Sequence, residues 1–341
     1  MIPEKFIKES VVNYCDVIGV NPLLVQGAGG NVSWKDGGTL WIKASGAWLS
    51  DATQNDIFVP VDLVHLQKSV LSGNFSVLPK LRAESNLRPS IETLLHALMP
   101  HPVVIHLHAI EVLAHLVRHG VELTLSSVLG TKVRWTNVGY FKPGEELASA
   151  VWTALLTTPD ADVVFLQSHG IVIGGEDIDA VNGILRTLTD AFKTVQRPIL
   201  SMPQPASDIY LDDGKSYVPV RDLSVHQLAI DMVLFNRLAS DWALYPDHVV
   251  FLGPKARMFE CIGDFKKTCQ KAINCPELAF VRGVGVFVLP DFSIGKYSQL
   301  CCYYDVLSRQ VEGTMLSSLG EDQIADLLDW DAEKYRMHVA K

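Results

Sequence analysis

The sequence predicts an α/β protein with two globular parts. Segments with helical periodicity alternate with short β-branched apolar runs, both before and after residue 200. Between the two parts the chain reads Arg197-Pro-Ile-Leu-Ser-Met-Pro-Gln-Pro-Ala-Ser-Asp208, and three prolines among small and polar residues cannot continue a helix. We therefore predict a boundary near residue 200, which divides the chain into domains of residues 1–200 and 201–341.

Short apolar runs predict the strands of the first part. These runs, rich in Val, Ile and Phe, cover residues 39–44, 57–61, 103–108 and 162–167. In the second part we expect a strand over 249–252 and a strand pair around the Arg282-Gly-Val-Gly turn. The sequence itself does not determine whether the sheets are parallel or antiparallel.

Helices are predicted from apolar residues spaced at three and four positions. Between Ser90 and Met99 this spacing predicts an amphipathic helix capped by the Ser90 hydroxyl. A longer apolar stripe predicts a helix over 176–197, whose first-turn acids suit the positive end of a helix. Further helices are expected over 224–238 and 258–271, and from the last strand to the end of the chain.

Composition excludes several classes of function. The 341 residues include 38 acidic and 29 basic side chains, so the net charge of −9 argues against a nucleic-acid partner. The chain has no apolar run of about 18 residues and no signal-peptide core at its start, so we expect no membrane partner. Six cysteines without CxxC spacing favour a reducing, cytoplasmic location.

Histidines are concentrated in one short segment, with six of the 11 between His96 and His119. His106 and His108 stand two apart on a predicted buried strand, so their side chains should share a face. Burying two imidazoles is costly unless each has a partner, and one divalent cation would satisfy both. The alternative is that they are hydrogen-bonded core histidines. His169, which follows a predicted strand and precedes Gly170, is a candidate third nitrogen ligand or a structural residue.

Glu92 is the candidate acid/base. It is expected in the first turn of the helix that begins after Ser90, with His96 one turn later on the same side. There it could act as a general base near a metal, or as a ligand when no substrate is bound. The alternative is a solvated acid stabilised by the helix N-terminus.

Two loops could bind an anion through backbone N–H groups. Gly27-Ala-Gly-Gly-Asn31-Val-Ser33 lacks the third glycine of a dinucleotide-binding motif, so a dinucleotide cofactor is not expected. Its N–H groups and Asn31 could form an anion-binding nest, as could Ser45-Gly46. Ordinary tight turns are the alternative for both loops. GxSxG, GxxxxGK[ST] and HExxH motifs do not occur in the sequence.

Five of these short motifs, taken in order, resemble the class II aldolase/adducin family. They are GGNVS, ASG, PSIE, HLH and SHG, and the resemblance covers roughly residues 5–197. It is similar in particular to longer members, related to the aldolase half of rhamnulose-phosphate aldolase/alcohol dehydrogenase fusions. The resemblance implies a three-layer α/β/α domain with a mainly antiparallel central sheet, followed by a smaller C-terminal α/β domain.

The resemblance also implies a set of site residues and a partner. A divalent metal, usually Zn²⁺ with Mn²⁺, Co²⁺ or Mg²⁺ as alternatives, would be held by His106, His108 and His169. Glu92 would be the acid/base, and Tyr140 of a neighbouring subunit would donate a proton. The substrate would be a sugar or sugar phosphate and the assembly a homo-oligomer, a tetramer in family aldolases. The residues that would face the phosphate are Asn31, Ser45, Gly46 and Ser90.

Two positions depart from the family pattern. Ala28 stands where sugar-phosphate aldolases often have a threonine, and Ile91 replaces the second serine of their PSSE motif. Both changes remove a hydroxyl donor, so a phosphate would be held less well. The substrate is therefore bound differently or carries no phosphate.

The sequence thus predicts a metal-dependent lyase of the aldolase type, which cleaves a C–C bond of a ketose or ketose phosphate through a metal-stabilised enediolate. The alternative is epimerisation, decarboxylation or dehydration of a sugar-like substrate at the same site. A non-catalytic, adducin-like binding protein is a third hypothesis, disfavoured because the histidines and Glu92 are all present. For residues 201–341 three roles stay open: covering the site, extending an oligomer interface, or binding a regulator.

Overall fold

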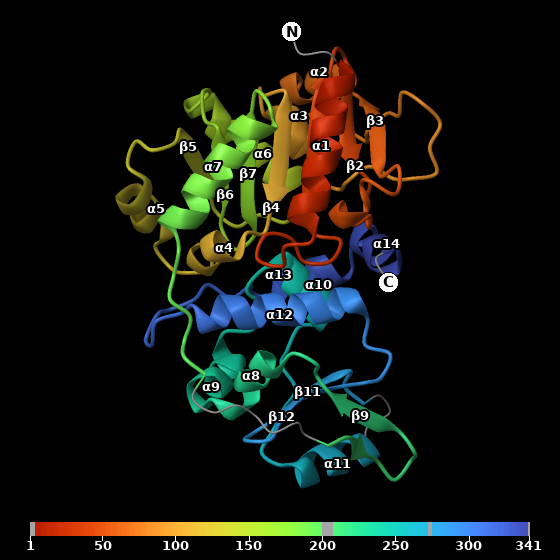
Figure 1. Ribbon diagram of the computed structural model, residues 1–341, viewed down its shortest axis with the longest axis vertical. Helices are drawn as coiled ribbons and strands as arrows, with labels where there is room; N and C mark the ends of the chain where they lie inside the picture. The colour runs from red at the N-terminus through yellow and green to blue at the C-terminus, as the bar shows by residue number, and fades with distance from the viewer. Residues whose placement is uncertain (1–3, 200–206, 272–274, 340–341) are drawn as a thin grey trace.

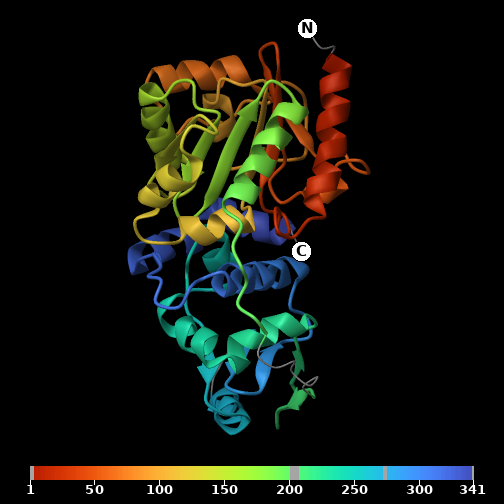
Figure 2. The same cartoon turned by 60° about the vertical axis from the view of Figure 1, so that its left-hand side comes forward.

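A computed structural model describes residues 4–199, 207–271 and 275–339, and it contains two β-sheets (Figures 1 and 2). The first part holds a seven-stranded sheet with the strand order β3-β2-β1-β4-β7-β6-β5. The second part holds a five-stranded sheet with the order β10-β11-β12-β9-β8. The predicted α/β class, with a smaller sheet domain in the C-terminal part, is therefore confirmed.

The first part consists of alternating helices and strands. Its strands are β1 (Asn31–Asp36), β2 (Thr39–Lys43), β3 (Phe58–Asp62), β4 (Val103–Leu107), β5 (Trp135–Val138), β6 (Val163–Leu166) and β7 (Gly170–Gly175). Its helices are α1 (Glu4–Gly19), the short 3₁₀ helix η1 (Leu49–Asp51), α2 (Leu63–Leu71), α3 (Thr93–Leu98), α4 (Ile110–Leu116), α5 (Val121–Leu129), α6 (Glu145–Thr157) and α7 (Ile178–Ala191).

The large sheet is the middle of three layers. Every pair of neighbouring strands in it is antiparallel except β5 and β6. Because side chains alternate along a strand, Ile105 of β4 joins the apolar core beneath α1, α4, α5 and α7, whereas Val104 joins the core beneath α2, α3 and α6. Both faces are covered, as the resemblance implied. His106 lies on the same face as Val104.

The second part begins with a hairpin and ends with three helices. Its strands are β8 (Ile209–Tyr210), β9 (Ser216–Pro219), β10 (Met258–Phe259), β11 (Leu278–Val281) and β12 (Gly285–Val288). Its helices are η2 (Leu223–His226), α8 (Gln227–Ile230), α9 (Met232–Ser240), α10 (Pro246–Leu252), α11 (Ile262–Lys271), α12 (Ile294–Ser308), α13 (Glu321–Leu328) and α14 (Asp331–Val339). Across the described ranges, none of the helices has both the length and the apolar character that a bilayer span requires.

The second part packs directly against the first. Its helices α10, α12, α13 and α14 lie between the two sheets, next to the large domain (Figure 1). On α4, Glu111 accepts a hydrogen bond from Arg309, and the Ala114 carbonyl accepts one of 2.9 Å from Gln310. One apolar cluster contains residues of both parts. The predicted boundary near residue 200 falls on residues 200–206, outside the described residues, so the division at 200 stays a prediction.

Three predictions for the second part are wrong in detail. Residues 249–252 belong to helix α10 instead of a strand, because Pro246 at the first helical position and Asp247 in the first turn begin a helix. The helix expected over 224–238 is interrupted at Asp231, whose side chain caps α9 by accepting from the Val233 N–H. Residues 258–259 form β10, so the expected helix starts only at Ile262.

In the first part β2, β3, β4 and β6 were predicted to within one or two residues, whereas β1, β5 and β7 were not predicted, and the two predicted helices were too long. Helix α7 ends at Ala191 instead of residue 197. Beyond it, the Glu111 carboxylate accepts hydrogen bonds from the Thr194 N–H and hydroxyl, which replace the bonds of a further helical turn.

Candidate metal and active site

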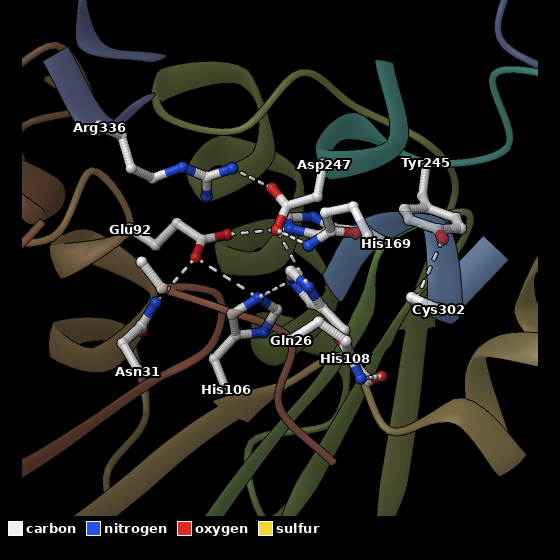
Figure 3. A network of polar contacts seen from close by, with 12 residues as sticks. Gln26, Asn31, Glu92, His106, His108, His169, Tyr245, Asp247, Cys302 and Arg336 are labelled. Carbon is white, nitrogen blue, oxygen red and sulfur yellow. Dashed lines mark hydrogen bonds and ion pairs between the residues drawn. The ribbon is translucent and has the colours of Figure 1, made fainter. Parts of the chain in front are cut away.

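Three buried histidines meet at one end of the large sheet (Figure 3). His106 is the second-last residue of β4, and His108 follows that strand directly. His169 lies in the tight turn between β6 and β7. Because β4 and β6 both pair with β7, the strand order brings the three rings together. Their candidate ligand atoms lie within 4.8 Å of one another, and the Nε2 atoms of His106 and His108 are 3.1 Å apart.

This cluster fits a divalent cation of the zinc type. Imidazole nitrogens each about 2.1 Å from a tetrahedral ion are about 3.4 Å apart, close to the 3.1 Å between the Nε2 atoms of His106 and His108. A ligand imidazole must be neutral, and burial lowers the pKa of His108 to about 3 and lowers that of His106 as well. The Nδ1 atom of His106 donates to the Ile171 carbonyl at 3.0 Å, which leaves Nε2 free to face the cluster.

Glu92 contacts two of these histidines. Its carboxylate oxygens lie 3.1 Å from the Nε2 atom of His169 and 3.4 Å from that of His106. Burial raises the pKa of Glu92, but the surrounding histidines outweigh this effect and hold it well below its usual value, so the carboxylate is ionised. A buried carboxylate needs a positive partner, which a cation held by the histidines would supply.

The turn before α3 explains how Glu92 reaches the histidines. The helix begins at Thr93, so Glu92 precedes it instead of lying in its first turn. The Ser90 hydroxyl accepts a hydrogen bond of 3.2 Å from the Glu92 N–H, and the Ser90 carbonyl accepts from Thr93. These local bonds replace the first helical turn. As a result Glu92 points into the protein and is 6% exposed, which rules out the solvated alternative.

Asn31 connects Glu92 to His96. The Asn31 side-chain N–H group donates to Glu92 at 3.0 Å, so its Oδ1 must accept the hydrogen bond from His96 Nε2. The other ring nitrogen of His96 then accepts from the Ser33 hydroxyl at 2.7 Å. His96, predicted only as a neighbour of Glu92, thus orients the carboxylate through Asn31.

The other predicted substrate-binding residues are near the same loops. Ser90 is committed to the turn before α3, whereas the Ser45 hydroxyl is buried and has no hydrogen-bond partner among the described residues. Gly46 has φ of +80°, which favours glycine, and lies against α14: a Cβ atom there would be 2.8 Å from the Cβ of Val339. Helix α14 therefore covers the Ser45–Gly46 loop.

Tyr140 is not part of the histidine cluster in this chain. It follows β5, which is three places from β4 in the sheet. Its ring packs on the edge of the larger core, and its hydroxyl is buried without a hydrogen-bond partner among the described residues. Burial and the nearby Glu146 and Asp326 raise its pKa. A proton-donor role for Tyr140 at a neighbouring subunit's site stays a prediction.

Three charged residues near the site were not predicted from the sequence. Lys43 is buried on β2, and its ammonium donates to the carbonyls of Ala28 at 2.9 Å and Ala47 at 2.7 Å, which links the two predicted anion-binding loops. Burial lowers the pKa of Lys43 to about 7. Asp247 of α10 and Arg336 of α14 form a buried ion pair next to His108. Pro246 and Asp247, a helix-start signal, could have placed Asp247 at a helix N-terminus, but not near His108.

Gly170 is required by close packing around the site. The backbone of the turn uses a positive φ of 50° at Ser168, whereas Gly170 provides space: a Cβ atom there would be 2.5 Å from the Leu107 carbonyl oxygen and 3.0 Å from the His108 ring. The glycine is therefore required for steric reasons.

Replacing Gly170 with alanine should destabilise the protein by about 1–3 kcal/mol, because backbone must move to admit the methyl group. Urea unfolding of the metal-free protein measures this change. Gly183→Ala is the control, because a Cβ atom there meets nothing within 4 Å and the residue lies inside helix α7. It should stabilise by about 0.4–1 kcal/mol. Equal stability of both variants would contradict the steric role of Gly170.

Comparison with known proteins agrees with the fold. Residues 9–195 match the model of the Class II Aldolase and Adducin N-terminal domain. This match covers more than half of the chain, so the chain belongs to the class II aldolase and adducin family. The family contains enzymes with metal-dependent aldolase activity, and the buried histidine cluster lies within the matched residues.

Individual relatives are distant. A Bacillus subtilis (strain 168) protein described as uncharacterized oxidoreductase YuxG is 26% identical over 184 residues, which are 49% of this chain and 26% of that protein. The chain thus spans about a quarter of the length of this relative. A solved N-terminal class II aldolase domain from Thermoplasma acidophilum is 22% identical, with a TM-score of 0.48, over 56% of this chain and 93% of that one. A sugar-phosphate aldolase from Thermotoga maritima is 17% identical, with a TM-score of 0.43, over 55% of this chain and 92% of that one.

Proposed function

We propose that this protein is a divalent-metal-dependent lyase of the class II aldolase type, which cleaves a C–C bond of a ketose or ketose phosphate. The observation that carries the proposal is the contact of a buried Glu92 carboxylate with two of three converging imidazoles. His106, His108 and His169 would hold the metal, with zinc as the preferred ion because the ligands are nitrogen atoms in a compact group.

A bound cation would polarise the substrate carbonyl and stabilise the negative charge that develops when the C–C bond breaks. Glu92 would move a proton to or from the carbon next to the carbonyl, because it is the ionised carboxylate that faces the histidines. The His96–Asn31 chain would keep its Oε2 atom oriented. Under this proposal Tyr140 would donate its proton in a homo-oligomer, where it could face a neighbouring site.

A second candidate keeps the site and changes the reaction to epimerisation, decarboxylation or dehydration. The observation that favours it is the position of Val339 against Gly46, since α14 covers a loop that the family resemblance assigns to phosphate binding. Together with Ala28 and Ile91, this cover favours a substrate without a phosphate group.

Two measurements test these functions. Elemental analysis of the purified protein should find about one divalent ion per chain. NMR analysis of products, over a panel of ketose phosphates and free ketoses, should find one aldehyde and one ketone product from a cleaved substrate. Isomerised, decarboxylated or dehydrated products would instead support the second candidate. A protein that binds no divalent metal would contradict both, and would leave the non-catalytic hypothesis.

A further inference from the structure

The C-terminal part reaches the histidine cluster with buried polar side chains. Asp247 comes from the first turn of α10, Gln299 from α12 and Arg336 from α14. All three lie outside residues 9–195, the part that matches the family model. Figure 3 shows Asp247 next to the imidazoles, with Arg336 directed toward its carboxylate.

Asp247 contacts Nδ1 of His108, the ring nitrogen that does not contact His106. The Oδ2 atom of Asp247 is 3.5 Å from His108 Nδ1, while His108 Nε2 faces His106 Nε2 at 3.1 Å. The two nitrogens of the His108 ring therefore have different surroundings, one at a carboxylate and one at the cluster. His106 has the same arrangement, with the Ile171 carbonyl in place of the carboxylate.

The Asp247 carboxylate is held in place from several directions. Gln299 donates to its Oδ2 atom at 3.1 Å, and Arg336 donates to its Oδ1 atom. The glycine-rich loop leaves room for the contact, because a Cβ atom on Gly29 would be 3.2 Å from Asp247 Oδ2 and 3.5 Å from His108 Nδ1. The carboxylate is 3% exposed, so water does not weaken its interaction with the imidazole.

We propose that Asp247 is a positioning residue for the metal centre: it accepts the Nδ1 proton of His108 and so keeps Nε2 unprotonated and directed at the ion. Such carboxylate–histidine pairs fix the tautomer of a ligand and raise its basicity. The C-terminal part, through α10, thereby completes a site whose ligands all come from the first part. This inference rests on the proposed function, in which the three histidines hold a divalent cation.

Zinc affinity of three variants, measured by competition with a chelator, tests this role. Asp247→Asn removes the charge but keeps an oxygen for Arg336, and its affinity for zinc should fall by about 10–100-fold. Arg336→Gln keeps the Asp247 carboxylate beside His108 with Gln299 still bound to it, so its zinc affinity should fall much less than that of Asp247→Asn, although its thermal stability without metal should fall. Asp241→Asn is the matched control, because Asp241 is also a buried carboxylate of the second part that pairs with an arginine, Arg237.

A purely structural role predicts a different pattern. Zinc affinity would then follow the thermal stability of the metal-free variants, with Arg336→Gln at least as weak as Asp247→Asn, and this pattern would overturn the inference. Wild-type zinc affinity in folded Asp247→Asn would overturn it too, while the proposed function would stand. Absence of zinc binding by the wild type would overturn both.

A measurement on the wild type does not depend on how the variants fold. In the zinc-loaded protein labelled with ¹⁵N-histidine, two-bond ¹H–¹⁵N spectra distinguish a proton on Nδ1 from one on Nε2. His108 should carry its proton on Nδ1, with slow exchange because the Asp247 contact is buried. A proton on Nε2 of His108 would contradict the positioning role.

Discussion

Replacing His106 with alanine should remove zinc binding from the protein. The wild type is expected to retain about one zinc ion per chain after dialysis, and the variant should retain almost none. His106 lies at the centre of the cluster, since its ring centroid is 5.0 Å from that of His108 and 4.9 Å from that of His169. Loss of a residue that is hydrogen-bonded to a metal ligand lowers the affinity for the metal by about 10–100-fold. Loss of the ligand itself should therefore lower the zinc affinity by more than that.

His101→Ala is the control for this experiment. His101 belongs to the same histidine-rich segment, but its Nε2 atom contacts Asp162 at 3.1 Å and takes no part in the cluster. Its zinc content should equal that of the wild type. If His106→Ala still holds one zinc ion per chain, or if both variants lose it equally, the metal is not held by the three histidines.

Replacing Glu92 with glutamine should lower kcat by about 10²–10⁴-fold at saturating zinc, because the amide cannot accept the proton that the carboxylate takes. Saturating zinc is needed because Glu92 contacts His106 and His169 and its loss can also weaken metal binding. The glutamine side chain has nearly the same shape, so the fold should be retained. The measurement is steady-state kinetics on whichever substrate the product panel identifies.

Asp162→Asn provides the matched control for Glu92. Asp162 is also a largely buried carboxylate that contacts a histidine, His101, but it precedes β6 at the end opposite His169. Its replacement should leave kcat unchanged. A folded, zinc-loaded Glu92→Gln protein with the kcat of the wild type would show that another group moves the proton.

Local sequence patterns predicted much of the first part and of the site. Short apolar runs predicted β2, β3, β4 and β6, because the residues that mark a buried strand lie within a few positions of one another. The spacing of His106 and His108 predicted that the two imidazoles share a site, and the structure brings both together with His169. The sheet itself stayed undecided from periodicity, because strand pairing depends on residues far apart in the chain; only the family resemblance implied that it is mainly antiparallel.

Where local signals compete, sequence patterns were misleading. The apolar run 249–252 reads equally well as a strand or as part of a buried helix, and the proline at 246 decides for the helix. Glu92 was expected in a helical turn because the apolar spacing begins before it. Hydrogen bonds that Ser90 accepts from Glu92 and Thr93 instead form a turn that directs the carboxylate inward.

The sequence by itself determined the family, the α/β class and the residues that converge as a candidate metal site, because motif order and side-chain periodicity are local properties of the chain. Only the tertiary structure decided that Asp247 stands behind His108, that Arg336 pairs with it, and that α14 covers the loop at Gly46. These contacts join residues of the second part to loops of the first. They depend on how the two parts pack against each other, and the local sequence around a residue does not determine that packing.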